Sequence, residues 1–153
     1  MWQNFWNLRV NDRLAQWKDF RHELDRLPLE SAVTELNLMW STAPFINYNL
    51  DASDPTNWPD PWALLAENYW CDVAKALGII YTIYFTHHRN TPIELRVYYD
   101  YKDKQRYTVA WLEDGKYILN YWPYEIVNTK QIEETQLQLL YQYSSTDLQL
   151  EKY

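Results

Sequence analysis

Residues 58–88 decide the fold of this chain, and they read WPDPWALLAENYWCDVAKALGIIYTIYFTHH. Asp60 and Pro61 form a strong helix start, because an Asp carboxylate accepts from first-turn amides and Pro suits the first helical position. Gly78 stands where helices usually end. The stretch therefore predicts a helix that begins at Pro61 and stops at Gly78, followed by a hydrophobic strand over 79–86.

The only cysteine of the chain, Cys71, falls inside this expected helix, on the side opposite the apolar face. It is expected about eleven residues past the helix start, far from the positive end of the helix that favours a thiolate. His87 and His88 end the expected strand. Neighbouring strand residues point to opposite faces, so at most one of the two histidines could reach back toward Cys71.

The segments on either side complete an expected architecture of three helices, four strands and one helix. Apolar residues recur at helical spacing in two N-terminal segments, alternation with a hairpin turn at Asp114-Gly115 predicts three further strands, and Asn128-Thr129 with Gln131 predicts the cap of a last helix. The expected helices are 2–26, 29–41 and 130–143, and the expected strands are 93–101, 106–113 and 116–122.

This order predicts an α+β fold, with three N-terminal helices, a four-stranded antiparallel meander and one C-terminal helix. Residues 1–143 are expected to form a single α+β domain, and residues 144–153 a polar C-terminal tail. Between the second and third helices, the Asn-, Asp- and Pro-rich residues 45–58 are too apolar for a free linker, so an ordered loop is expected there.

The composition excludes several classes of function. A net charge of −7 argues against a protein that binds the nucleic-acid backbone, which needs a basic face. One cysteine allows neither an intrachain disulfide nor a cysteine-rich zinc site. No run of 18 apolar residues is present, so no membrane partner is expected. With only two glycines, a phosphate-cradling loop is not expected either.

The sharpest chemical hypothesis is a thiol nucleophile with a histidine base, in which Cys71, His87, His88 and Asp100 would be the catalytic residues. The alternative is that Cys71 is a small buried hydrophobe, which is the commoner role of a lone cysteine in a helix. Adjacent strand histidines chelate metals poorly, and acidic pairs such as Asp51 with Asp54 lack the spacing of a calcium loop. No metal site and no cofactor is therefore expected.

Residues 71–120 resemble a worn transglutaminase-like core. The resemblance rests on the run from Cys71 to Ile79, on Val109-Ala110-Trp111, and on the segment from Asp114 to Asn120. In that family a cysteine opens a helix, a histidine precedes Ala-Trp on a later strand, and an aspartate lies on the next strand. Here Val109 stands at the histidine position and Asn120 at the aspartate position. The resemblance thus implies the fold without the complete triad.

A second resemblance is to uncharacterised small proteins of large tailed, T-even-like marine phages. It rests on residues 40–47, WSTAPFIN, on residues 57–65, NWPDPWALL, and on residues 76–82, ALGIIYT. It implies a phage origin, synthesis in the host cytoplasm, and a place in the virion neck, tail or baseplate.

Two main functional hypotheses follow. The first is a non-enzymatic phage structural or accessory protein, because 18% of the residues are aromatic and no complete catalytic set is present. Its partners would be other phage or host proteins, or a second copy of the chain. The alternative is a transglutaminase-like cysteine hydrolase or acyltransferase with Cys71 as nucleophile. A weaker third hypothesis is a small-ligand binder. The interaction residues expected under the first hypothesis are Trp2, Trp6, Phe45, Tyr48, Trp58, Trp122 and Tyr124.

Overall fold

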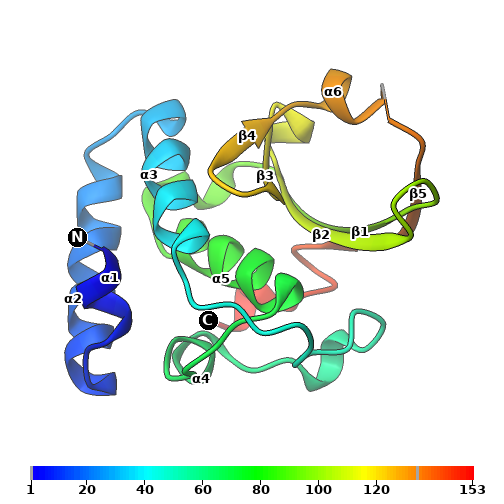
Figure 1. Cartoon of the computed structure of the whole chain (residues 1–153). Helices are drawn as coiled ribbons and strands as arrows, with labels where there is room; N and C mark the ends of the chain where they lie inside the picture. Colours follow the sequence, from blue (N-terminus) through cyan, green and yellow to red (C-terminus); the bar gives the residue numbers. More distant parts are fainter. Residues whose placement is uncertain (1, 134) are drawn as a thin grey trace.

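The computed structural model describes residues 2–133 and 135–153 and has an α+β fold, as predicted. A curved antiparallel sheet lies on one side, and helices lie on the other, with helix α5 between the sheet and helix α3 (Figure 1). The helices are α1 Trp2–Trp6, α2 Val10–Asp25, α3 Leu29–Ser41, α4 Pro61–Leu65, α5 Asp72–Tyr84 and α6 Thr129–Glu133. The strands are β1 Ile93–Asp100, β2 Gln105–Leu112, β3 Tyr117–Trp122, β4 Glu125–Val127 and β5 Leu137–Ser144.

The five strands follow the order β4-β3-β2-β1-β5, and all neighbours are antiparallel. Strands β1 and β2 form a regular hairpin with Ile93 opposite Leu112. Strand β2 runs next to α5, so the residues of β2 that alternate toward the helix face its first turns. The sheet therefore brings β2 over the part of the chain that contains the cysteine.

Helix α5 is the centre of the core and continues through Gly78 to Tyr84, where a strand was expected. Its residues 73–83 are all buried, and a helix that is apolar on every side has no amphipathic pattern to distinguish it from a buried strand. Gly78 does not end the helix. It makes room for Trp40 of α3, whose ring would lie 2.3 Å from a Cβ at this position.

The expected continuous helix from Pro61 to Gly78 is divided into α4 and α5, because tertiary contacts hold the segment between them out of helical conformation. The Arg13 guanidinium donates to the carbonyl oxygens of Leu65 and Glu67, just past the end of α4. Trp70 then pairs with the loop after α3, accepting from the amide of Ile46 at 3.2 Å. The sequence pattern around Asp60 predicted the start of α4 correctly, since its carboxylate accepts from the Ala63 amide.

The first and last expected helices are also divided. The segment 2–26 forms α1 and α2, and the segment 130–143 forms α6 and then β5, which adds a fifth strand beside β1. The predicted cap of α6 is confirmed by reciprocal hydrogen bonds between Asn128 and Gln131. Within the described residues, no helix has the length and apolar character needed to cross a membrane.

The last ten residues, expected as a polar tail, pack against the domain instead. Leu150 is fully buried and Leu148 is 9% exposed, and both belong to the main hydrophobic core. Tyr153 lies against Tyr81 of α5, with ring centroids 5.7 Å apart. The two buried leucines anchor this segment because each removes an apolar side chain from water.

Candidate active site

Cys71 caps the N-terminus of α5, not the middle of a helix as predicted from the sequence. Its backbone is extended, with φ −80° and ψ 177°, and its carbonyl oxygen accepts the first helical hydrogen bond, from Lys75. The thiol makes no capping hydrogen bond. Partial positive charge is concentrated at this end of a helix, and the first amide groups have no acceptor within the helix. Cys71 therefore lies at the end of a helix that favours a thiolate, contrary to the sequence prediction.

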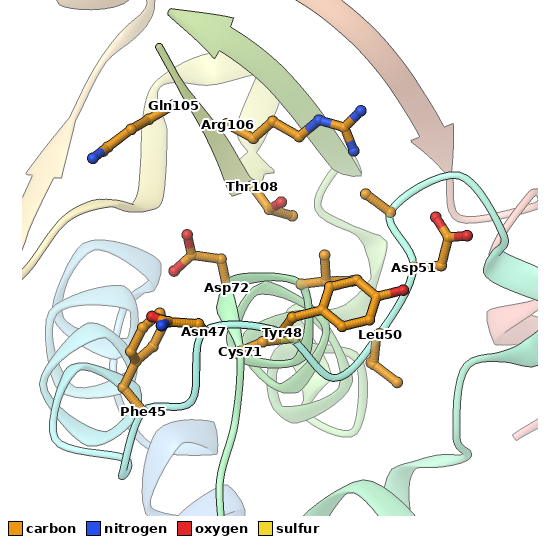
Figure 2. A pocket seen from close by; sticks show the side chains of 12 residues that line it. Phe45, Asn47, Tyr48, Leu50, Asp51, Cys71, Asp72, Gln105, Arg106 and Thr108 are labelled. Carbon is orange, nitrogen blue, oxygen red and sulfur yellow. The ribbon is translucent and has the colours of Figure 1, made fainter. Parts of the chain in front are cut away.

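A cavity of about 470 Å³ lies at this helix start. The start of α5 and strand β2 line it together with the loop after α3. The lining residues are Cys71, Asp72 and Val73, Gln105, Arg106 and Thr108, and the loop residues Phe45, Asn47, Tyr48, Leu50, Asp51 and Ala52. Figure 2 shows Asp72 at the start of α5, with Thr108 of β2 higher in the view and Cys71 and Tyr48 lower. Cys71 itself is 3% exposed, so only its edge borders the cavity.

The loop that forms one wall of this cavity is held in place from several sides. The indole of Trp58 donates to the Asp51 carbonyl oxygen, and the Tyr143 hydroxyl of β5 donates to the Ala52 carbonyl oxygen, both at 2.8 Å. The Asp51 carboxylate accepts from the amide and hydroxyl of Ser53, and these hydrogen bonds lower the pKa of Asp51. The wall is thus shaped by defined hydrogen bonds.

Asp72 and Lys75, both in the first turn and a half of α5, carry the unusual electrostatics of the site. Burial raises the pKa of the Asp72 carboxyl, and the positive charge of Lys75 opposes that rise. Burial likewise lowers the pKa of the Lys75 ammonium, against the attraction of Asp72. Within the described residues, neither charged group has a hydrogen-bond or ion-pair partner. Perturbed carboxyl and amino groups of this kind gather at functional sites.

Asn120 ties the start of α5 to the sheet. Its Nδ2 donates to the carbonyl oxygens of Asp72 and Thr108, both at 3.0 Å, and its backbone has φ 72°. The transglutaminase-like resemblance placed a histidine position at Val109. The structure corrects this register, because Val109 belongs to the hydrophobic cluster on the other face of the sheet. Thr108 is the residue of β2 that lines the cavity with Cys71.

The other three predicted catalytic residues do not lie with Cys71. His87 and His88 fall in the short 3₁₀ helix that follows the C-terminus of α5, while Cys71 lies at the N-terminus. The His87 ring contacts Asp25 at 3.1 Å, and the His88 ring contacts the carbonyl oxygens of Leu24 and Leu27. Asp100 ends β1 and accepts from the amides of the next turn.

The aromatic residues predicted as an interaction surface are only partly exposed. Trp6 is buried in the core, against Trp40 and Trp70, and Trp2 packs on Phe5 and Phe20. Trp58 is half-buried, whereas Phe45, Tyr48, Trp122 and Tyr124 are exposed. Phe45 and Tyr48 are exposed because they line the open cavity beside Cys71.

Sequence reasoning missed Lys75, Thr108 and the loop around Tyr48 as parts of the site. The acidic residue Asp72 was the one available signal, because Asp is favoured in the first turn of a helix and thus marks a helix start at Cys71. Within residues 2–133 and 135–153, no group of three or more His, Cys, Asp or Glu side chains could hold a metal ion.

Similar folds are found among solved structures. Three structures of LapG from Legionella pneumophila superpose on the chain, one of them EGTA-treated and one calcium-bound. The EGTA-treated structure gives a TM-score of 0.70 at 12% sequence identity and covers 94% of this chain and 82% of LapG. The calcium-bound structure gives a TM-score of 0.69 at 11% identity, over 93% of this chain and 81% of LapG. No protein-family model matches the chain, and no curated protein sequence does.

The likeness shows that the chain has the LapG fold, and LapG is a transglutaminase-like cysteine protease. This agrees with the transglutaminase-like resemblance and gives no support to the phage resemblance. It contradicts the expectations of a non-enzymatic structural protein and of a chain that is not an enzyme. Those expectations rested on the aromatic content and on the lack of a complete catalytic set. Part of that second argument was the expected place of Cys71 inside a helix, whereas Cys71 begins one.

Proposed function

We propose that the chain is a cysteine-dependent hydrolase or acyltransferase that acts on amide or ester bonds, with Cys71 as its nucleophile. The observation that carries this proposal is that Cys71 and Asp72 open the buried helix α5 and line one cavity. The fold, shared with a cysteine protease, supports it. A thiol at a helix N-terminus is well placed for nucleophilic attack, because that position favours negative charge.

In the proposed reaction Asp72 takes the place of a histidine base. The thiol proton passes to the Asp72 carboxylate while the sulfur forms a bond to the substrate carbonyl carbon. A base works best when its pKa approaches the working pH, and burial moves the pKa of Asp72 in that direction. In this proposal the first-turn amides of α5, including that of Val73, donate to the negative oxygen of the tetrahedral intermediate.

The second half of the reaction returns the site to its starting state. The C–N or C–O bond breaks, and the leaving amine or alcohol takes the proton from the Asp72 carboxyl. Water or an amine then attacks the thioester carbon, the Cys71 sulfur leaves as a thiolate, and the proton of the attacking group passes to the Asp72 carboxylate and on to the sulfur. Thr108 of β2 lines the same cavity as Asp72 (Figure 2).

The test is hydrolysis of p-nitrophenyl acetate by the full chain at pH 7. Cys71→Ala is expected to abolish the catalysed rate, and Asp72→Asn to lower it about 100-fold, which is the usual scale of general base catalysis. His87→Ala and His88→Ala are the controls, since both histidines lie at the other end of α5. Their rates should stay within about twofold of the unmodified chain. Full activity of Cys71→Ala, or loss of activity in a histidine variant alone, would overturn the proposal.

A further inference from the structure

A second cavity of about 330 Å³ adjoins the cysteine cavity. The two cavities share Phe45 and Asp72, so they meet at the proposed base. Lys75 lines the second cavity and is absent from the first. The order along the helix is therefore nucleophile, base and then cation. A substrate held across Asp72 would extend from Cys71 toward Lys75.

Lys75 is a mostly buried cation that no hydrogen bond or ion pair within the described residues holds, although the charge of Asp72 attracts it. The residue is 8% exposed, and among the described residues its ammonium group forms neither a hydrogen bond nor an ion pair. Its Nζ lies 5.6 Å from the centre of the Phe45 ring, and that contact does not replace an anion. A buried ammonium is costly unless it is paired. The position of Lys75 in the cavity wall points to an anion that the substrate supplies.

Three aromatic rings line the rest of the second cavity, those of Phe45, Tyr107 of β2 and Tyr121 of β3. Pro123, Ser41 and Asn120 complete its wall. Asp72 is the acidic residue in the wall, and it disfavours a free anion at its own end of the cavity. A ligand that suits both ends has an amino group beside Asp72 and a carboxylate beside Lys75, with an apolar side chain against the rings.

We infer that the leaving group of the substrate is an amine that carries a carboxylate, and that Lys75 binds this carboxylate in the second cavity. This inference rests on the proposed function and adds the chemical class of its substrate. The scissile bond is then an amide that joins an acyl group to an amino acid residue. When the C–N bond breaks, the nitrogen takes the Asp72 proton, and the amino acid leaves with its carboxylate at Lys75.

The helical spacing fits a substrate of this size. Cys71 and Lys75 are four residues apart, which is about 6 Å along a helix axis. In an amino acid, one carbon atom separates the nitrogen from the carboxylate carbon, so both groups fit within one turn. The carboxylate has two chemical sources, either the α-carboxylate of a C-terminal residue or the side chain of Asp or Glu. In the first case the peptide ends at the carboxylate that Lys75 binds. In the second case it continues beyond the Asp or Glu residue.

The test measures binding, so that it does not depend on turnover. The full chain and its Lys75→Met variant are titrated with phenylalanine, phenylalaninamide and the α-amide of glutamic acid, and amide chemical shifts are followed by NMR. Lys18→Met is the matched control, because Lys18 is exposed on α2, far along the chain from the site. Cys71→Ala, titrated in parallel, separates binding from reaction at the thiol.

Phenylalanine is expected to bind about tenfold or more tightly than phenylalaninamide, because a hydrogen bond to a charged group contributes on that scale. The advantage should vanish in Lys75→Met and persist in Lys18→Met and Cys71→Ala. Tight binding of glutamic acid α-amide instead of phenylalanine would assign the carboxylate to an acidic side chain. Equal binding of acid and amide, an advantage that survives in Lys75→Met, or no binding of any probe would overturn the inference. Acylation of Cys71 would be unaffected by those results, so the two proposals can fail separately.

Discussion

The side-chain amide of Asn120 donates a hydrogen bond to the backbone carbonyl oxygen of Asp72, with a donor–acceptor distance of 3.0 Å. The same nitrogen donates to Thr108 of β2, so one side chain fixes the sheet against the first turn of α5. Asn120→Ala is expected to lower the free energy of unfolding by about 2 kcal/mol and to slow acylation of Cys71 about tenfold.

Chemical denaturation and the p-nitrophenyl acetate assay measure the two effects of Asn120→Ala. Asn49→Ala is the control, because Asn49 is exposed in the loop after α3. An Asn120→Ala variant with unchanged stability and rate would show that this contact does not position the site.

Arg13 holds the turns on either side of the core together. Its guanidinium donates to four backbone carbonyl oxygens, of Trp6, Leu8, Leu65 and Glu67, and it is 3% exposed. Arg13→Met would leave these acceptors unpaired, so we expect a loss of about 3 kcal/mol or more in unfolding free energy. Arg9→Met, at an exposed position, should change it by less than about 0.5 kcal/mol. Similar denaturation midpoints for both variants would contradict this role.

For Gly78→Ala, the sign of the change in stability tests the packing of Trp40 against α5. In an ordinary helix, Gly→Ala stabilises by about 1 kcal/mol. Here the added Cβ would lie 2.3 Å from the Trp40 ring, so Gly78→Ala is expected to destabilise by about 1–3 kcal/mol. Thermal unfolding measures the change. The Trp40→Leu variant lacks the ring that would clash. Gly78→Ala should therefore cost less stability when it is added to Trp40→Leu than when it is added to the unmodified chain. A stabilised Gly78→Ala variant would place Trp40 elsewhere.

The pH dependence of acylation follows from Asp72. Burial raises the pKa of Asp72, so the carboxylate, and with it the rate, should appear as pH rises through a value above the ordinary 3.8. Asp72→Asn should lack this step. The stability effect has the opposite direction, because a raised folded-state pKa contributes stability below the unfolded pKa and loses it as pH rises through the folded one. Asp72→Asn should therefore gain relative stability as pH rises through that window. The same pH–rate profile in the unmodified chain and in Asp72→Asn would exclude Asp72 as the base.

The sequence predicted the parts of the fold that local patterns control. The α+β class, the β1–β2 hairpin segments, the start of α4 at Asp60 and the Asn128–Gln131 cap depend on nearby residues, and the structure contains them. The division of the expected long helix was not predictable in this way. It depends on Arg13, which is more than fifty residues away from Leu65 and Glu67 in sequence, and on pairing of Trp70 with the loop after α3.

That one error displaced the whole candidate site. With Cys71 placed inside a helix, His87 and His88 were the bases that the sequence offered. The structure puts Cys71 at a helix start, moves the histidines to the opposite end of α5, and brings Asp72 beside the cavity. The long-range contacts of Arg13 and Trp70 thus determine which side chains share the site. The alternation of residues in β2 does not by itself show that Thr108 faces the site.

The most direct test of the central claim is the mass of the intact chain after brief reaction with p-nitrophenyl acetate, followed by proteolysis and peptide mapping. One added acetyl group is expected, carried by the peptide that contains Cys71 and removed by hydroxylamine, as a thioester would be. Asp72→Asn should acquire it more slowly. An unmodified Cys71 in the folded chain, or an acetyl group carried only by lysines, would contradict the assignment of Cys71 as the nucleophile.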